Sequence, residues 1–196
     1  MKKTWITLGA IFLLLLWTYS SFKHFQNTAV EMQESVSAQW GNVEAAYQER
    51  NDLIPNLVNT VKGYAKHEKE TLEAVIKARA SATQVKIDAD HLTPEKIRQF
   101  QEAQKGLSGA LSRLLLVVER YPELKADKHF LELQSQLEGM ENRIRVERTR
   151  YNKITKTYNT FIRKFPNSIW ARILGFEPLP YFKSEKGAEK APKVEF

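Results

Sequence analysis

The sequence predicts an all-α protein: an elongated antiparallel bundle of about four long helices, preceded by one N-terminal transmembrane helix. Two observations lead to this prediction. Residues 4–22 carry no charge, and beyond them apolar side chains recur every three or four residues, the spacing of one helix face. The 196 residues are 42% hydrophobic and 11% aromatic, which is enough for one folded domain and excludes a disordered or collagen-like chain.

Residues 4–22 are predicted to form a membrane anchor. A helix of this length rises about 28 Å, close to the hydrocarbon thickness of a bilayer. Two alternatives remain open: a cleaved signal peptide, for which Thr18-Tyr19-Ser20 is a poor cleavage site, and a buried core helix. The residues expected in the anchor, with aromatic rings towards its ends, are Trp5, Ile11, Phe12, Leu13, Leu14, Leu15, Leu16 and Trp17.

The flanking charges predict the orientation of this anchor. Lys2 and Lys3 precede the apolar run, whereas Lys23 alone follows it closely. Because positive flanks favour the cytoplasmic side, we expect a cytoplasmic N-terminus and a bundle outside the cytoplasm. The expected organisation is a flank at 1–3, the anchor at 4–22, the bundle at 23–182 and a loose charged tail at 183–196.

The first bundle helix is expected at about 25–50, placed to continue the anchor helix. The second is expected to begin near Asp52, with Pro55 in its first turn, where a missing amide hydrogen is tolerated. The stripe of the first helix is Val36, Trp40, Val43 and Tyr47. The stripe of the second is Leu57, Val61, Tyr64, Leu72 and Val75.

Thr93-Pro94-Glu95 is a start signal for the third helix, which Pro122 is expected to end. The fourth helix is expected at about 127–165. Its predicted stripe is Leu133, Leu137, Met140, Ile144, Tyr151, Ile154, Tyr158 and Phe161. Beyond it, Ser168 is expected to cap a short amphipathic turn that Gly175 ends, and residues 176–182 are expected to lie on the bundle.

The sequence carries no recognisable catalytic, cofactor-binding or metal-binding motif. His67-Glu68 begins like the helical zinc motif, but Thr71 stands where the second histidine is required. There is no cysteine, which excludes disulfides, thiolate metal sites and cysteine nucleophiles. We therefore expect a non-enzymatic protein without cofactor or metal.

Charged residues close to the apolar stripes are candidates for a polar network that fixes the register of the helices, or for a partner-binding pocket. A buried charge is costly unless it is paired, so several of them should meet across helices. Simple solvation beside the stripe is the third alternative. The candidates are Glu68, Arg79, Glu119, Glu141 and Arg148, with Glu147 nearby.

The stretch 142–156 carries six basic residues and one acidic residue, which could attract a polyanion such as an anionic lipid headgroup or a cell-wall polymer. Solvated or helix-pairing charges are the simpler interpretation. Nucleic acid is not expected as a partner, because no nucleic-acid-binding module is recognisable. The six basic residues are Arg143, Arg145, Arg148, Arg150, Lys153 and Lys156.

The chain after the anchor resembles the LemA family. The residues that carry the resemblance are Arg50-Asn51-Asp52-Leu53-Ile54-Pro55-Asn56-Leu57-Val58, Val61-Lys62-Gly63-Tyr64-Ala65, His67-Glu68, Thr71-Leu72-Glu73, Ala78-Arg79, Glu119, Tyr121-Pro122, Leu124-Lys125-Ala126, Phe130, Leu133-Gln134, Glu141-Asn142-Arg143-Ile144, Arg148, Tyr151-Asn152, Tyr158-Asn159, Phe165-Pro166 and Gly175-Phe176. The resemblance implies a single-pass, membrane-anchored helical bundle of the bacterial cell envelope. It implies no catalytic residue and no cofactor.

These observations favour a membrane-tethered scaffold or interaction protein that associates with copies of itself or with another envelope protein. Long heptad stripes can extend packing between subunits, and tethering in a membrane raises the effective concentration. An adaptor for a membrane protease or an envelope signalling system is the second hypothesis. A binder of anionic lipid or cell-wall polymer is the third.

Overall fold

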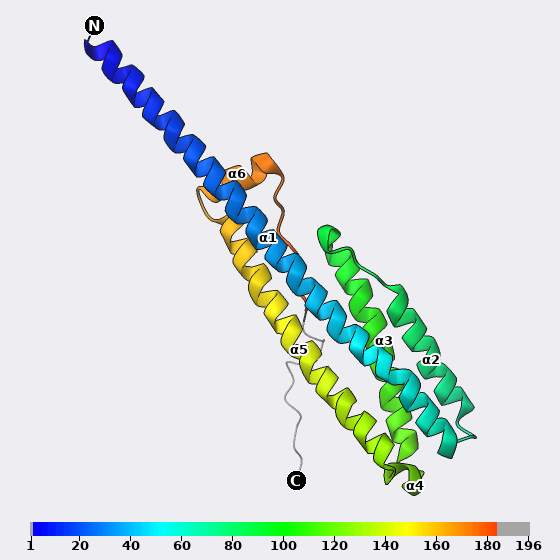
Figure 1. Cartoon of the computed structure of the whole chain (residues 1–196). Coiled ribbons are helices and arrows are strands. Elements are labelled where there is room, and N and C mark those ends of the chain that lie inside the picture. The colour runs from blue at the N-terminus through cyan, green and yellow to red at the C-terminus, as the bar shows by residue number, and fades with distance from the viewer. Residues whose placement is uncertain (1, 184–196) are drawn as a thin grey trace, which may run out of the picture.

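The computed structural model describes residues 2–183, and these residues form helices and no β-strand. Four long helices run alternately away from and towards the N-terminal end of the bundle (Figure 1), which confirms the predicted all-α fold. All but the first residue of the predicted tail at 183–196 lie outside the described residues. The elements are α1 (Lys2–Tyr64), α2 (Lys69–Gln84), the 3₁₀ turn η1 (Ala89–His91), α3 (Pro94–Val118), α4 (Pro122–Lys125), α5 (Lys128–Arg163) and α6 (Asn167–Leu174).

The first helix, α1, is one continuous helix of 63 residues that includes the predicted anchor, the predicted first bundle helix and the start of the predicted second. The expected helix boundary near Asp52 was wrong, because Pro55 lies inside α1. A proline cannot donate to the carbonyl four residues earlier, which here belongs to Asn51. The Arg79 Nε of α2 donates to that carbonyl instead, at 2.8 Å. This hydrogen bond gives the Asn51 carbonyl the donor that Pro55 cannot supply.

The chain first reverses direction after Tyr64, within the segment predicted to be a single second helix. Leu57 and Val61 therefore belong to α1, whereas Leu72 and Val75 belong to α2. All four side chains are buried in the same core cluster, because the turn folds the two helices onto each other. Four of the five predicted stripe residues are therefore core, although they come from two antiparallel helices. The fifth, Tyr64, was wrong: it lies at the end of α1, is 42% exposed and donates its hydroxyl to the Asp127 carboxylate.

The starts of the third and fourth predicted helices are confirmed. The Thr93 side chain accepts a hydrogen bond from the Lys96 amide at the start of α3. The Asp127 carboxylate accepts one from the Phe130 amide at the start of α5, at 2.9 Å. Such side-chain caps satisfy amides that have no partner within the helix.

The short helix α6 starts differently from the prediction. Its N-cap position is occupied by Pro166, without a side-chain cap, and the Ser168 amide donates to the Lys164 carbonyl. The expected capping role of Ser168 was therefore wrong. Gly175 ends α6 as predicted: its φ of 75° is left-handed, a conformation that glycine adopts without steric cost.

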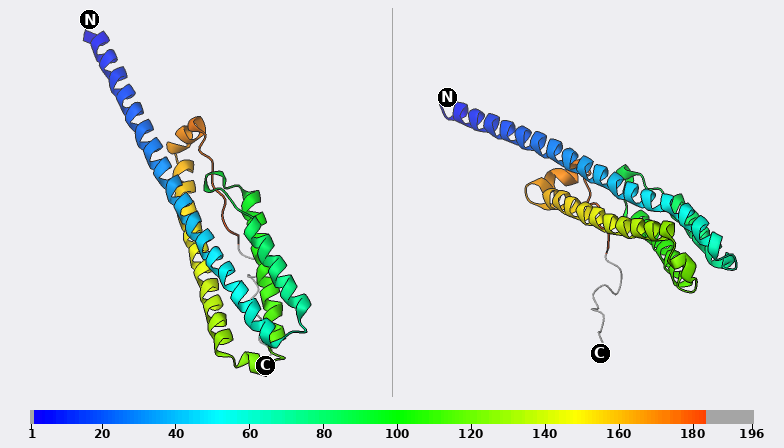
Figure 2. Two further views of the ribbon diagram at one scale, coloured as in Figure 1. Left: turned by 45° about the vertical axis from the view of Figure 1, so that its right-hand side comes forward. Right: turned by 60° about the horizontal axis from the view of Figure 1, so that its bottom comes forward.

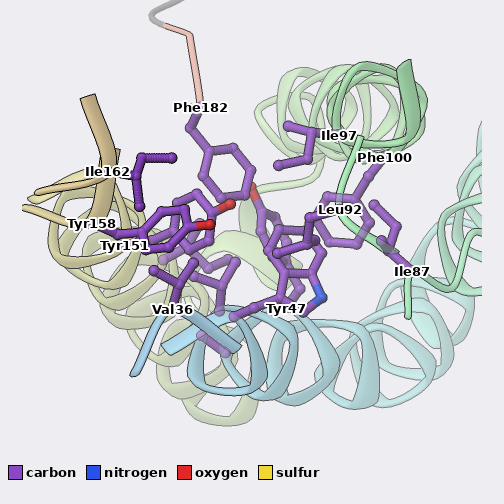
Figure 3. Packing of buried hydrophobic residues seen from close by; sticks show 14 of the residues in the cluster. Val36, Tyr47, Ile87, Leu92, Ile97, Phe100, Tyr151, Tyr158, Ile162 and Phe182 are labelled. Atoms are coloured by element: carbon purple, nitrogen blue, oxygen red, sulfur yellow. The ribbon is translucent and has the colours of Figure 1, made fainter. Parts of the chain in front are cut away.

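The core consists of two clusters arranged along the bundle. The cluster nearer the N-terminal end is rich in aromatic side chains and includes Tyr47, Tyr151 and Phe182, drawn from α1, α5 and the segment after α6 (Figure 3). Trp40 of α1 belongs to the same cluster. The second cluster is aliphatic and includes Leu107 and Leu114 of α3. Residues 176–182 therefore lie on the bundle, as predicted.

The apolar N-terminal part of α1 projects beyond the bundle (Figure 2). It is long and apolar enough to cross a membrane, and none of its most apolar window is buried within the protein. Large side chains from Trp5 to Trp17 are 48–74% exposed. The alternative of a buried core helix was therefore wrong, because no other part of the described chain covers these side chains.

Candidate functional site

Arg50 lies at the junction of the two core clusters and is the most buried charged residue described. Its guanidinium donates to three residues of two other helices: Gln104 at 2.6 Å and Ser108 at 3.1 Å in α3, and Glu141 at 2.6 Å in α5. It also lies over the Tyr47 ring, 5.2 Å from the centroid. The guanidinium is 1% exposed and the Glu141 carboxylate 51%, so the ion pair extends from the core to the surface.

Grooves lie on both sides of this polar centre. One, of about 470 Å³, lies between α3 and α5 and is lined by Ser108 and Glu141 as well as by leucines. The other, of about 350 Å³, is lined by Gln104 and by Glu44, a carboxyl whose pKa is raised by burial. Partners of Arg50 are thus accessible from two faces of the bundle.

Sequence reasoning missed Arg50 as a site residue, although a signal existed. Arg50 follows Val43 and Tyr47 at the spacing of the stripe, and Ile54 continues that spacing. A charge at a stripe position is expected to point into the bundle. Its neighbour Asn51 is also buried, and the Oδ1 atom of this side chain has no hydrogen-bond partner.

The five predicted network residues lie in separate places and do not form one cluster. Of the five, Glu141 is the one that bonds directly to Arg50. Glu119 pairs with Lys125 at the surface. Arg79 hydrogen-bonds the Asn51 carbonyl, and its terminal nitrogen is 3.9 Å from the Asp52 carboxylate.

The other two predicted network residues lie apart from each other. Glu68 is in the turn between α1 and α2, whereas Arg148 lies near the middle of α5, beside Tyr47. Glu68 accepts hydrogen bonds from Arg120 at 2.9 Å and from the Tyr121 hydroxyl at 3.2 Å. Arg148 lies over the Phe182 ring and donates to the Lys183 carbonyl. Both residues connect segments that are distant in sequence.

A second buried polar contact connects α1 to α5. The Gln39 side-chain amide donates to the Glu147 carboxylate at 2.7 Å, and Arg150 donates to the other oxygen of that carboxylate at 3.0 Å. Glu147 is 8% exposed, so its charge is compensated by both contacts.

Two asparagines of α5 hold the extended segment after α6 by its main chain. Asn159 donates to the Leu179 carbonyl and accepts from the Leu179 amide, both at 2.8 Å. Asn152, seven residues earlier in α5, makes the same pair of bonds to Phe182, both at 2.9 Å. Because both bonds go to main-chain atoms, this clamp fixes the path of the segment whatever side chains the segment carries.

Two tyrosines of the same helix face reinforce the clamp. The Tyr158 hydroxyl donates to the Glu177 carbonyl and the Tyr151 hydroxyl to the Pro180 carbonyl. Burial raises the pKa of both phenols to about 12. The Phe182 ring stacks on Trp40 and meets Tyr151 edge to face, which closes the aromatic cluster.

The predicted polyanion-binding stretch is largely exposed, but four of its six basic side chains interact with other residues of the chain. Arg143 pairs with Glu49, Arg150 pairs with Glu147, and Arg148 is held by Phe182. Arg145 donates to Asn142. Lys153 and Lys156 line a groove of about 480 Å³ together with Lys164.

Among the residues that the structure describes, no three histidine, aspartate or glutamate side chains are grouped so that they could hold a metal ion. What the geometry offers is contact surface: two grooves beside a buried arginine, and an extended segment held against α5 by its main chain.

Comparison with known proteins identifies the family. A family model described as LemA family matches residues 39–196. The chain belongs to the LemA family. This confirms the resemblance noted in the sequence, and the model covers the bundle from Gln39 onward.

Similar curated proteins carry magnetosome names or the family name. Magnetosome protein MamQ 2 of Paramagnetospirillum magneticum is 30% identical over 189 residues, covering 86% of this LemA-family chain and 68% of the relative. Magnetosome protein MamQ of Magnetospirillum gryphiswaldense is 27% identical, covering 96% and 73%. Protein LemA of Metamycoplasma hominis is 24% identical, covering 92% and 76%. With the apolar helix, these relatives indicate a membrane-associated helical protein.

Proposed function

We propose that this LemA-family protein is a membrane-anchored, non-enzymatic scaffold of the bacterial cell envelope that associates with copies of itself. The observation that carries the proposal is the groove of about 470 Å³ between α3 and α5. Leu111, Leu115 and Leu137 form its apolar lining. Such a groove fits the apolar face of a partner helix.

The rim of this groove suits a specific contact. Ser108, Gln134 and Glu138 offer donors and acceptors around the apolar lining, as in protein interfaces with an apolar centre and a polar rim. A bundle tethered to a membrane meets copies of itself at high effective concentration, so even a modest surface supports assembly. An adaptor for a membrane protease or a signalling system would present the same groove to a different protein.

Photo-crosslinking in cells tests the proposal with the full-length chain. A photo-reactive amino acid at Leu115 or at Leu137 should give adducts between copies of the protein. Leu116 is the matched control, because it follows Leu115 on the same helix, does not line the groove and is 71% exposed. Self-adducts from Leu115 and Leu137 but not from Leu116 would support the scaffold.

Other outcomes of this experiment decide against self-association. A single foreign protein captured at Leu115 and Leu137 would support the adaptor function instead. Equal adduct yields from the groove positions and from Leu116 would show that the groove is not an interface.

For the membrane arrangement, we propose an uncleaved anchor at 4–22 with the N-terminus in the cytoplasm and the bundle outside it. The single additional lysine before the apolar run supports this orientation. A reporter fused after Phe196 should be inactive if it requires the cytoplasm. Activity of such a reporter would show the opposite orientation, with the bundle in the cytoplasm.

Binding of anionic lipid or cell-wall polymer through the basic face of α5 is a second candidate function. Lys153, Lys156 and Lys164 line one groove of about 480 Å³ together with Met32 and Phe161. This combination of three ammonium groups with apolar side chains suits an anionic amphiphile. Replacing all three lysines with glutamine should abolish a salt-sensitive co-sedimentation with anionic vesicles. Unchanged co-sedimentation would exclude this groove as the site of lipid binding.

A further inference from the structure

Helix α6 has an apolar side that faces away from the bundle. Ile169 and Ile173, one turn apart, are 50% and 64% exposed, and Phe165 in the preceding turn is 81% exposed. The opposite side of the helix is attached to the aromatic core cluster through Ala171, which is buried, and through Trp170. The exposed side chains are therefore not turned towards any described part of the protein.

The position of α6 places this apolar side at the end of the anchor. The Trp170 indole donates to the Ser21 hydroxyl at 3.3 Å, and its ring meets the Phe22 ring edge to face at 5.5 Å. Ser21 and Phe22 are the last two residues of the uncharged stretch, and Lys23 follows them. α6 lies across α1 at the end of the bundle from which the apolar part of α1 projects (Figure 1). In a membrane, α6 thus lies at the depth where the span meets water.

The charges around α6 suit the same location. Arg163, Lys164 and Arg172 are exposed beside the apolar side chains. Residues 148–176 contain no aspartate or glutamate, so nothing in this stretch repels an anionic headgroup. Basic residues that flank an apolar helix face are typical of helices lying in the plane of a membrane interface.

We propose that α6 is an interfacial membrane helix, a second attachment of this chain to the bilayer, with Phe165, Ile169 and Ile173 inserted below the headgroups. The proposal depends on the proposed function in one respect only: residues 4–22 must cross the membrane. Two attachments hold the bundle at a defined tilt on the surface, whereas a single span permits free tilting.

Spin labelling of the full-length protein in phosphatidylcholine–phosphatidylglycerol vesicles tests this inference. The chain contains no cysteine, so each variant carries a single label and no native residue must be removed. Ile173→Cys and Phe165→Cys place labels on the proposed interfacial surface, where both native side chains are exposed. Leu14→Cys is the reference within the span, and Leu116→Cys is the reference for an exposed leucine of the bundle.

The measurement is the accessibility of each label to molecular oxygen, which partitions into lipid, and to a water-soluble nickel chelate. We expect labels at Ile173 and Phe165 to be at least threefold less accessible to the chelate than the label at Leu116. The label at Leu14 should be the most protected of the four.

The two possible failures are distinguishable. Labels at Ile173 and Phe165 as accessible to the chelate as the label at Leu116, with Leu14 protected, would overturn the inference and leave the anchor intact. A label at Leu14 that is open to the chelate would overturn the anchor itself, and with it the inference.

Discussion

Arg79 of α2 compensates for Pro55 of α1. Its Nε donates, at 2.8 Å, to the Asn51 carbonyl, the acceptor that a residue other than proline at position 55 would use within the helix. A proline inside a long helix is thus tolerated because a second helix supplies the missing donor.

This relationship predicts an interaction energy between the two positions. Arg79→Met should lower the free energy of unfolding by about 1–2 kcal/mol, because it removes a charge-assisted hydrogen bond. In a Pro55→Ala background the same substitution should cost about half as much, because the alanine amide donates to the Asn51 carbonyl. Urea unfolding of the four variants measures the cycle. Equal costs of Arg79→Met in both backgrounds would contradict the compensation.

Removal of Glu141 should leave the buried guanidinium of Arg50 without its counter-charge. Loss of one partner of a fully buried ion pair costs about 3–5 kcal/mol, and we expect Glu141→Leu to cost about 2 because the carboxylate is half-exposed. Arg50→Met combined with Glu141→Leu should cost less than Glu141→Leu alone, since no buried charge remains. Thermal and urea unfolding give the comparison. A double variant with a lower free energy of unfolding than Glu141→Leu would show that the ion pair itself stabilises the fold.

The asparagine clamp predicts a local effect. Asn159→Ala should remove both bonds to Leu179 and cost about 1–2 kcal/mol. Amide hydrogen exchange should accelerate at Leu179 and Phe182, while α3 amides are unaffected. Asn159→Asp keeps the acceptor for the Leu179 amide but turns a buried anionic oxygen towards the Leu179 carbonyl, so it should accelerate exchange at the same two amides. Faster exchange spread evenly over all helices would mean global destabilisation and no clamp.

The buried phenols predict a loss of stability at high pH. Burial raises the pKa of Tyr151 and of Tyr158 to about 12, compared with about 10 in an unfolded chain. The folded state therefore retains these protons more strongly. The resulting stabilisation is complete below about pH 10 and is lost as the pH rises from about 10 to 12.

Melting curves between pH 8 and pH 12 measure this loss. The Tyr151→Phe Tyr158→Phe double variant should have a lower melting temperature at pH 8 and a smaller further decrease above pH 10. A parallel decrease in the variant and in the native chain would assign the alkaline transition to other groups.

Elements with local start and stop signals were predictable from the sequence. Thr93 with Pro94 marks the start of α3, Asp127 marks that of α5, and Gly175 marks the end of α6, since each acts on amides or carbonyls within a few residues. The continuity of α1 through Pro55 was not predictable in this way. It depends on Arg79, which is distant from Asn51 and Pro55 in the sequence but contacts the Asn51 carbonyl in the fold.

The candidate site was less accessible to sequence reasoning. Glu141 was identified as a network candidate, but its buried partner Arg50 was not, although Arg50 occupies the stripe position that follows Tyr47. Asn152 and Asn159, seven residues apart, already share a helix face. Their partner is an irregular segment whose path no periodicity predicts.

Because α1 is unbroken, it joins the proposed membrane span and the bundle into one torsional unit. Each residue of an α-helix turns by about 100°, so one residue inserted between Phe22 and Phe25 would rotate the whole bundle by that angle relative to the lipid-facing side of the span. If a neighbouring membrane protein rotated the span about its axis, the continuous helix would transmit that rotation to the far end of the bundle.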